Sequence, residues 1–563
     1  MTSSRVILGP MMRYVDAVSA SIWFETRDSG EVVVRAAGRS WAARTFAVHG
    51  HHYALVHVDG LQPDSTLPYT VEIDGTPVWP DSKSSLPASV IATLGSEHPL
   101  RLSFGSCRTS VPHDEDGNRT HGVDALRACA LRLAAGGIDV PRPDLILFLG
   151  DQVYADLTTE KMQEFIRARR NISEPPGEEL ADYEEYAHLY RLAWSDEANR
   201  WLLSTVPTAM IFDDHDIRDD WNTSLSWKRK MEATSWWRGR IVAGLASYWV
   251  YQHLGNMSPA ERADDEMWRQ IAGHNGDTEI DISASLDVFA ERCDQEPTSY
   301  RWSYCRDIND VRLIVVDSRA ARQLEPARRA LLDDDETEWL DKRMRGGFRH
   351  LLIGTSLPFL LPPGLHHLES WDEAVSEGAW GKPAARVGER LRQLVDLEHW
   401  GAFQRSFRQL AAMATEVADG QRGPAPQTVT FLSGDVHYST VSEVHRTSGS
   451  RIVQAVCSPI RNPLPLAMRS FSAVLAYAIA TRLSALLARS AGVPSPPFRW
   501  AGIKGPWFDN CLASLEDTPA GLTLSWEQGV VHDGDHQHPL VETVATITLT
   551  PRTGQGTSTI LPT

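Results

Sequence analysis

Three short clusters of acidic and imidazole side chains in this 563-residue sequence have the composition of a catalytic or metal site. Each cluster follows directly after an apolar run of strand length. The clusters are Gly150-Asp151-Gln152-Val153-Tyr154, Asp213-Asp214-His215-Asp216 and Gly434-Asp435-Val436-His437. Carboxylate, imidazole and phenolate groups together suit a hard or borderline cation such as Fe, Mn, Ca or Zn. Because so many converging carboxylates would repel one another, the pattern favours a metal cluster over a metal-free acid–base pair.

Each cluster also has a simpler explanation when it is taken alone. A glycine followed by an aspartate is common in turns, DDHD is compatible with a solvated acidic loop, and GDVH with a strand-to-turn junction. The joint occurrence of all three, each at the end of an apolar run, favours a metal site.

The apolar runs predict the strands that must position these clusters. Six runs end in polar, chemically capable residues: RLSFGSCR, PDLILFLGDQVYAD, TAMIFDDHD, VRLIVVDSR, HLLIGTS and TVTFLSGDVHYS. Helical stretches, such as 181–204 and 335–345, lie between several of them. Apolar strands that alternate with helices indicate an α/β fold whose sheet is covered on both faces. In such sheets ligands bind beyond the strand ends, where these clusters lie.

The flanking regions differ from this α/β pattern. Residues 1–97 contain short β-branched and aromatic runs broken by turn residues, which predict a fibronectin-like β-sandwich before a catalytic domain over 98–563. Within that domain, 220–300 is rich in Trp and acidic residues and resembles an insertion or lid, and 520–552 again has a strand pattern. Alternation along strands explains the histidines at 49, 51, 52 and 57 better than metal binding does.

Composition narrows the choice of partners and location. The net charge of −18 disfavours a broad grip on nucleic acid or on an anionic membrane. An anionic substrate stays compatible, because a bound cation inverts the local field. The first residues show neither an export signal nor a twin arginine, so we expect a cytoplasmic protein. The apolar stretch 470–491 is interrupted by Arg482, which predicts a packed amphipathic helix and no membrane span.

The three clusters resemble the sequence blocks of the binuclear metallophosphoesterases. GDxxY is present, DHD stands in the place of GNH[DE], and GDxH stands in the place of GHxH. The closest resemblance is to the alkaline phosphatase D (PhoD-like) family, in which a Ser-Cys pair replaces the opening DxH block. Ser106-Cys107-Arg108 stands at that place, and VVDSRAAR (315–322) also fits. The resemblance runs from about residue 15 to at least residue 460, and it implies a four-layer αββα catalytic domain with an N-terminal β-sandwich.

The resemblance also implies metal ligands. Asp151 would bridge two metals, and Cys107, Tyr154 and His437 would bind a ferric ion together with it. Two further carboxylates would bind a second, divalent ion (Ca, Mn or Zn). They are Asp214, where related enzymes place an asparagine ligand, and Asp435, where they place the first histidine of GHxH. Other readings stay open, because Cys107 suits a buried small hydrophobic position and Tyr154 suits a packed aromatic position.

Two residues would act on the substrate. His215 matches the histidine that interacts with the phosphoryl group and the leaving oxygen, and Arg108 is placed to meet a phosphate oxygen. Pairing of Arg108 with a nearby carboxylate is an equally good reading. Asp317 and Arg319 in VVDSR are expected to form a structural ion pair beside the site.

The function implied is hydrolysis of small-molecule phosphate esters, monoesters or diesters, by a metal-bound hydroxide that attacks phosphorus. One alternative is a non-catalytic phosphate-binding module on a degenerate site. The presence of His215 argues against this alternative, because binding alone has little need of an acid–base residue. Another alternative is a phospholipase D-type phosphodiesterase that uses the same site.

Overall fold

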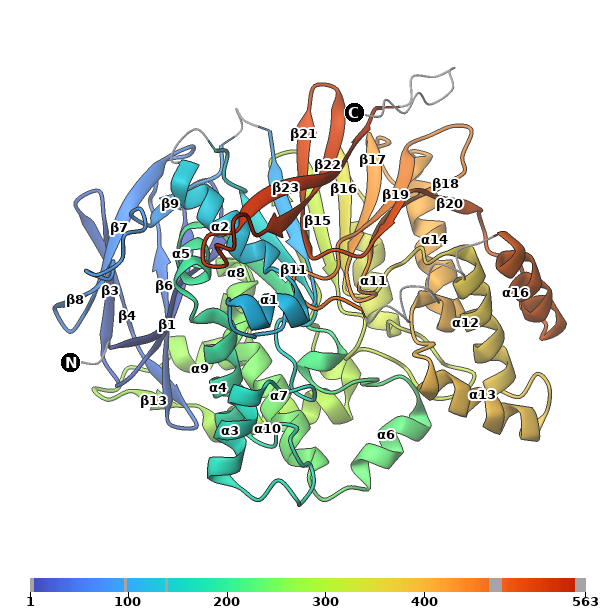
Figure 1. The fold of residues 1–563 in the computed structure, drawn as a ribbon, viewed down its shortest axis with the longest axis horizontal. Coiled ribbons are helices and arrows are strands. Elements are labelled where there is room, and N and C mark those ends of the chain that lie inside the picture. Colours follow the sequence, from blue (N-terminus) through green and yellow to red (C-terminus); the bar gives the residue numbers. More distant parts are fainter. Residues whose placement is uncertain (1–4, 96–98, 137–139, 465–477, 552–563) are drawn as a thin grey trace.

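The computed structural model describes residues 5–95, 99–136, 140–464 and 478–551. Its amino-terminal strands lie at one end of the molecule, and two larger sheets with their helices make up the rest (Figure 1). The predicted site residues follow the carboxyl ends of strands in the two larger sheets.

The amino-terminal region is a sandwich of two sheets. One sheet has the order β1-β2-β6-β5-β13 and the other β4-β3-β7-β8, with β9 paired to β7. The first nine strands are β1 (Val6–Val15), β2 (Ala20–Thr26), β3 (Glu31–Ala36), β4 (Arg39–Arg44), β5 (Phe46–Val48), β6 (His51–Val58), β7 (Thr66–Ile73), β8 (Thr76–Trp79) and β9 (Val90–Ala92). Side chains such as Ile22, Val34, Val56 and Val71 are fully buried between the sheets. The strand-rich amino-terminal region is therefore confirmed, while its boundary at residue 97 stays a prediction.

Three histidines of this sandwich contact carboxylates, most of which come from the part of the chain that follows the sandwich. β13 (Ile280–Asp281) adds to β5 as a parallel strand. Beside it, a ring nitrogen of His49 lies 2.9 Å from Asp287, and one of His52 lies 2.7 Å from Glu279. Both ring nitrogens of His51 are engaged, one with Glu25 at 3.0 Å and the other with Glu184 at 2.8 Å. Strand alternation alone omits these contacts, because the partners lie up to 238 residues away in sequence.

The stability of the protein is expected to depend on pH through the carboxylate contacts of His49 and His51. Hydrogen bonding to Asp287 raises the pKa of His49. Burial alone would lower the pKa of His51, but its bonds to Glu25 and Glu184 outweigh burial and raise that pKa. A histidine with a raised folded-state pKa stabilises the fold fully below its unfolded pKa of about 6.5, and this contribution is lost as pH rises through the folded pKa. The free energy of unfolding should therefore fall as pH rises above about 6.5.

Denaturant unfolding at a series of pH values tests this expectation in the wild type, His51→Gln and His57→Gln. His57 lies on the same strand, but burial and the nearby Arg262 lower its pKa, so its contribution has the opposite sign. The fall in the free energy of unfolding with rising pH should be smaller in His51→Gln than in the wild type. In His57→Gln it should equal or exceed that of the wild type. Identical pH dependence in wild type and His51→Gln would contradict the assignment.

Two large sheets form the part of the molecule that carries the predicted site residues. Their orders are β12-β11-β10-β21-β22-β23 and β14-β15-β16-β17-β19-β18-β20. The first consists of β10 (Arg101–Gly105), β11 (Leu145–Leu149), β12 (Thr208–Ile211), β21 (Cys511–Thr518), β22 (Gly521–Val530) and β23 (Leu540–Leu549). The second consists of β14 (Tyr304–Ile308), β15 (Val311–Val316), β16 (His350–Thr355), β17 (Thr428–Ser433), β18 (Ser439–Val444), β19 (Arg451–Val456) and β20 (Trp500–Trp507). All six predicted apolar runs are strands of these sheets, and the strand pattern of 520–552 adds β22 and β23 at one edge.

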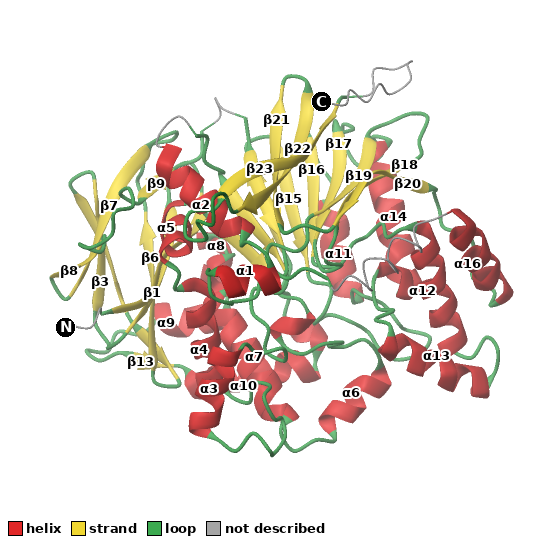
Figure 2. Ribbon diagram, viewed as in Figure 1, coloured by secondary structure: helices red, strands yellow, loops and turns green. Residues whose placement is uncertain are grey.

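The two sheets pack face to face, with helices outside. A Cβ on Gly354 of β16 would lie 3.2 Å from Leu147 and Leu149 of β11, and the Trp526 indole of β22 donates to the Val456 carbonyl of β19 at 3.0 Å. The outer helices α11 (Asp334–Arg343) and α14 (Gln404–Ala418) pack on the second sheet, and α2 (Ala125–Gly136) packs on the first. Figure 2 shows the strands of both sheets grouped between helices. The four-layer αββα prediction is therefore confirmed.

A predicted helical stretch and the predicted insertion or lid are organised in ways that the sequence did not show. The stretch 181–204 forms two helices, α4 (Tyr183–Trp194) and α5 (Glu197–Thr205). Within 220–300, α7 (Trp237–Tyr251) is buried along most of its length and packs against α4 and against α10 (Ser283–Gln295). This part of the segment therefore belongs to the core of the molecule, and the insertion or lid stays a prediction.

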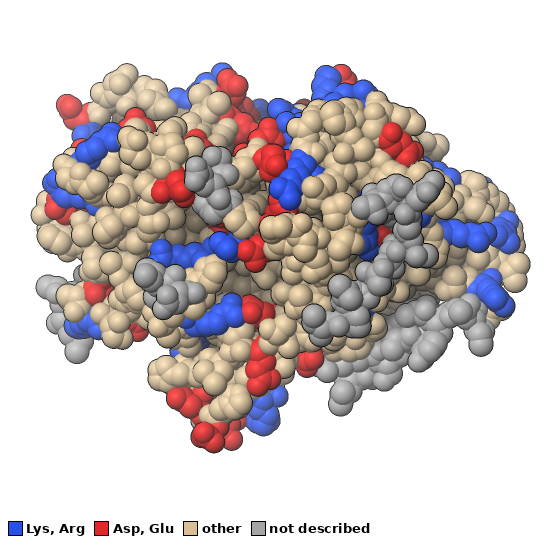
Figure 3. Space-filling view, turned by 90° about the horizontal axis from the view of Figure 1, so that it is seen from above, with Lys and Arg blue, Asp and Glu red and all other residues tan. Residues whose placement is uncertain are grey.

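Two observations on the described residues bear on the partners expected from composition. None of the helices in the described ranges is both long and apolar enough to cross a membrane. Helix α16 (Ala478–Ser490) coincides with the second half of the predicted 470–491 helix, and residues 470–477 lie outside the described residues. On the face drawn in Figure 3, acidic and basic side chains of the described chain are interspersed.

Candidate metal centre

The loops that follow β10, β11 and β17 turn sharply at the predicted ligands. Cys107, Asp151, Asp435 and His437 all have positive φ angles, of 57°, 49°, 64° and 53°. A non-glycine residue rarely adopts this left-handed conformation, and such residues concentrate at functional sites. The backbone is therefore bent so that side chains from three strand ends converge.

Close contact between the strand ends explains the glycine that precedes one of these ligands. A Cβ on Gly434 would lie 2.0 Å from the Ser106 hydroxyl oxygen. That oxygen accepts a hydrogen bond from the Asp435 amide at 3.0 Å. A side chain at position 434 would therefore separate the loop after β10 from the loop after β17.

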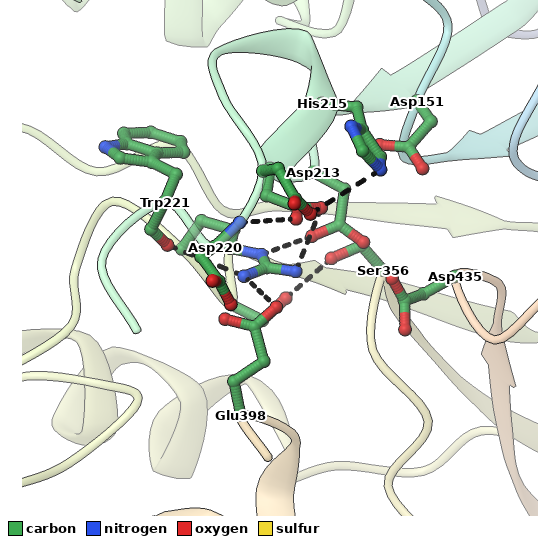
Figure 4. Close-up of polar contacts among 12 residues, drawn as sticks. Asp151, Asp213, His215, Asp220, Trp221, Ser356, Glu398 and Asp435 are labelled. Carbon is green, nitrogen blue, oxygen red and sulfur yellow. Dashed lines mark hydrogen bonds and ion pairs between the residues drawn. The ribbon is translucent and has the colours of Figure 1, made fainter. Parts of the chain in front are cut away.

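Five of the six predicted ligands, all except Tyr154, belong to linked groups of potential ligand atoms. Three groups each have potential ligand atoms within 4.8 Å of one another: Cys107, Asp151 and His437; Asp151, Asp214 and His215; and Asp213, Asp214 and Asp435. Asp151 belongs to the first two groups, and Asp214 belongs to the last two. Figure 4 shows Asp151, Asp213, His215 and Asp435 close together. Such shared membership suits two cations with a bridging carboxylate.

The polar groups of the centre fit bound cations. Oδ1 of Asp151, Oδ2 of Asp213 and the Tyr154 hydroxyl are buried and make no hydrogen bond within the described chain. Buried polar atoms without partners are costly, and a coordinated cation would give these oxygens a partner. Burial raises the pKa of Cys107, of Tyr154 and of Asp151 well above their ordinary values. A cation would offset this cost by favouring the thiolate, phenolate and carboxylate forms.

His215 is oriented by Asp156, which the sequence reading did not assign. Nδ1 of His215 lies 3.0 Å from both carboxylate oxygens of Asp156. Burial would lower the pKa of His215, but the charges of Asp156 and Asp214 outweigh it and raise this pKa well above its ordinary value. Asp156 stands two residues after the tyrosine of GDxxY, so its fixed spacing from that block was a usable signal. The pair is an imidazole held by a carboxylate, as in many acid–base sites.

Arg108 does not take the role of phosphate contact that the resemblance implied. Its Nε and Nη2 donate to Oδ2 of Asp124 at 3.0 and 2.7 Å, and Nη1 donates to the Ala193 carbonyl at 2.7 Å. The side chain is buried, and its three nitrogens are held by these structural contacts. The alternative reading, pairing with a nearby carboxylate, describes the observed contacts.

Arg319 takes a more central place than the sequence reading gave it. Asp317, the expected ion-pair partner, instead accepts from the backbone amides of Arg319 and the two residues after it. The fully buried guanidinium of Arg319 contacts Asp213, Asp214 at 3.1 Å and Glu398 at 2.6 Å. Nε of Arg319 donates to Asp213 and Nη1 donates to Glu398, two carboxylates that are labelled in Figure 4. Arg319 thus neutralises part of the acidic charge of the centre from within.

Asp435 also has a partner from a distant segment. Its Oδ2 lies 2.8 Å from Nε2 of His399. Burial would raise the pKa of Asp435, but the bond to His399 outweighs it and lowers that pKa to about 2. Glu398 and His399 stand in the sequence DLEH (396–399), which carries no motif, so no sequence signal pointed to either residue.

Comparisons with known proteins give a family for much of the chain and a solved structure of similar fold. A family described as PhoD-like phosphatase matches residues 130–478, and a domain of unknown function (DUF7800) matches residues 3–91. A solved structure described as "Structure of PhoD" is 13% identical, with a TM-score of 0.59, and the match covers 99% of this chain and 94% of that one. A purple acid phosphatase from seeds of yellow lupin (Lupinus luteus) is 10% identical, with a TM-score of 0.49 and coverage of 96% and 74%. None of the curated proteins matches the sequence.

Proposed function

Because this chain belongs to the PhoD-like phosphatase family, which matches residues 130–478 of its 563, we propose that it is a metal-dependent hydrolase of phosphate esters. The observation that carries the proposal is the continuous centre in which Asp151 is shared between two ligand groups and His215 stands beside it. A phosphate-binding module would have little need of an imidazole oriented by a carboxylate, as His215 is by Asp156.

The residues divide into two ligand sets. We propose that Cys107, Tyr154 and His437, together with Asp151, hold a ferric ion, because thiolate, phenolate and imidazole donors suit a transition metal. Two further carboxylates, Asp214 and Asp435, would hold a divalent ion such as Ca, Mn or Zn together with Asp151. When bound, these cations would supply Lewis acidity and lower the pKa of a water molecule in the centre.

The chain's own side chains bind and orient the substrate and move protons. Asp156 accepts from Nδ1 of His215 and so fixes the ring orientation and the tautomer. With Nδ1 held by Asp156, the other ring nitrogen, Nε2, is the one proposed to donate a proton to the leaving oxygen. Arg319 holds Asp213 and Asp214 in place and limits their mutual repulsion while an anionic substrate enters.

Residues 1–97 are proposed to support the centre and to contribute none of its ligands. Arg13, which is fully buried, donates to the Thr208 hydroxyl at 3.0 Å and to the Gln252 carbonyl. The Tyr69 hydroxyl donates to the Ser204 carbonyl at 2.7 Å. These contacts fasten the sandwich to β12 and to the helices beside the first large sheet.

Turnover of two chromogenic substrates tests the proposed function. Purified protein of measured metal content is assayed with p-nitrophenyl phosphate and with bis(p-nitrophenyl) phosphate. We expect hydrolysis of at least one ester, with a rate proportional to bound metal. Binding of inorganic phosphate without turnover of either ester would favour the non-catalytic module, and turnover of the diester alone would favour the phosphodiesterase.

Colour is expected to report the ferric ion. A phenolate bound to ferric iron gives a charge-transfer band, so concentrated protein should absorb visible light, and Tyr154→Phe should bleach this band while the fold is retained. The matched control is Tyr190→Phe, because Tyr190 is also buried but contacts Gln252 in the helical layer. Colourless, iron-free wild-type protein at full activity would refute the ferric assignment.

A further inference from the structure

His399 is clamped between two carboxylates that come from different elements. Its Nε2 lies 2.8 Å from Oδ2 of Asp435, and its Nδ1 lies 2.7 Å from Oε1 of Glu369. Glu369 belongs to α12 (Pro363–Ser376) and is fully buried, and its Oε1 also accepts from the His399 backbone amide at 3.4 Å. Both ring nitrogens are therefore engaged, which fixes the plane of the imidazole.

The clamp acts on the carboxylate that faces the centre. Asp435 has a ligand atom within 4.8 Å of those of Asp213 and Asp214, so the rotamer of its side chain decides where an acidic oxygen stands in the centre. The backbone of Asp435 already has a φ of 64°, a conformation that does not by itself fix the side chain. The bond from His399 holds Oδ2 of Asp435 and so fixes the direction in which the other carboxylate oxygen, Oδ1, points.

Glu398, the residue before His399, contacts the centre through Arg319. Glu398 contacts the Arg319 guanidinium at 2.6 Å, and Arg319 in turn contacts Asp213 and Asp214. The short segment 396–399, between α13 (Lys382–Leu394) and the 3-10 turn Trp400–Ala402, therefore reaches the centre through two successive side chains.

We propose that His399 is a positioning residue for Asp435, held in its own orientation by Glu369. The inference rests on the proposed function, in which Asp435 binds the divalent ion. Carboxylates that bind metals are held by hydrogen bonds from outer partners, and loss of such a partner typically weakens metal affinity about 10–100-fold.

Titration of the chelated full-length protein with Mn²⁺, followed by electron paramagnetic resonance, tests the inference. His399→Ala should weaken Mn²⁺ binding about 10–100-fold, and Glu369→Gln should weaken it by less in the same direction. Because Glu369 acts through His399, the double variant should bind Mn²⁺ as weakly as His399→Ala and no more weakly. In samples of the same variants purified without chelation, the visible band of the ferric ion should persist.

The matched control is His366→Gln. His366 is also a buried histidine and belongs to α12. It packs against Phe407 and Trp500 and contacts no residue of the centre among its described partners. This variant should lower the midpoint of thermal unfolding without changing Mn²⁺ affinity. If His399→Ala does not fold, Glu369→Gln carries the test alone.

Wild-type affinity in both His399→Ala and Glu369→Gln, or fully additive losses in the double variant, would overturn the positioning role while leaving the proposed function intact. A wild-type chain that binds none of Mn²⁺, Ca²⁺ and Zn²⁺ would overturn both, and the measurement on the wild type alone distinguishes that outcome.

Discussion

Asp151→Asn is expected to remove most of the bound metal and, with it, nearly all phosphoester hydrolysis. Asp151 is the residue shared by the two ligand groups around Cys107 and Asp214, so its loss affects both cations. A neutral amide has one acceptor oxygen and no charge, and it cannot bridge two cations as a carboxylate does. The loss of rate should exceed the roughly 10²–10⁴-fold effect of removing one acid–base group. Metal content by elemental analysis and turnover of p-nitrophenyl phosphate measure the two effects.

The matched control for this change is Asp317→Asn. Asp317 is also a buried carboxylate at the end of a large-sheet strand, β15, but it accepts from backbone amides and belongs to none of the ligand groups found in the described chain. We expect this variant to lose stability and to keep its metals. Wild-type metal content and turnover in Asp151→Asn would show that Asp151 does not bridge.

His215→Ala is expected to keep the metals and to lose about 10²–10⁴-fold in rate, the usual range for one positioned acid–base group. The loss should depend on the leaving group. Phenolate is a poorer leaving group than p-nitrophenolate and needs more protonation, so phenyl phosphate should suffer more than p-nitrophenyl phosphate. Asp156→Asn should show the same pattern with a smaller loss, because Asp156 acts only by orienting and charging the imidazole.

Three results would contradict this division of roles. The first is loss of metal in His215→Ala together with retention in Asp151→Asn. The second is an equal loss of rate for both leaving groups in His215→Ala, which would remove the general-acid role. The third is wild-type leaving-group dependence in Asp156→Asn, which would show that Asp156 does not act through His215.

The sequence predicted well those features that are encoded locally. A strand that is buried on both faces appears in the sequence as a continuous apolar run, which can be recognised without knowing its neighbours. All six predicted runs are strands of the two large sheets. The clusters after β11, β12 and β17 meet because strand ends at one edge of packed sheets must lie close together.

The errors arise where a side chain's direction or a distant partner decides its role. Arg108 is adjacent to Cys107, but its guanidinium is held by Asp124 and by the Ala193 carbonyl, so proximity in sequence did not bring Arg108 into the centre. Arg319 and His399 enter the centre from loops whose positions depend on the packing of whole elements. Asp156, by contrast, has a fixed spacing from GDxxY and could have been predicted.

The dependence of hydrolysis on bound metal can be measured by removing the metals and adding them back. Wild-type protein is stripped with a chelator, assayed with both chromogenic esters, and then titrated with ferrous iron in air and with Ca²⁺ or Mn²⁺, while bound metal and turnover are measured on the same sample. We predict that stripped protein is inactive, that turnover returns in proportion to metal bound, up to two ions per chain, and that Asp151→Asn regains neither. Full turnover by the stripped protein, or two bound ions per chain without hydrolysis of either ester, would contradict a metal-dependent phosphoesterase.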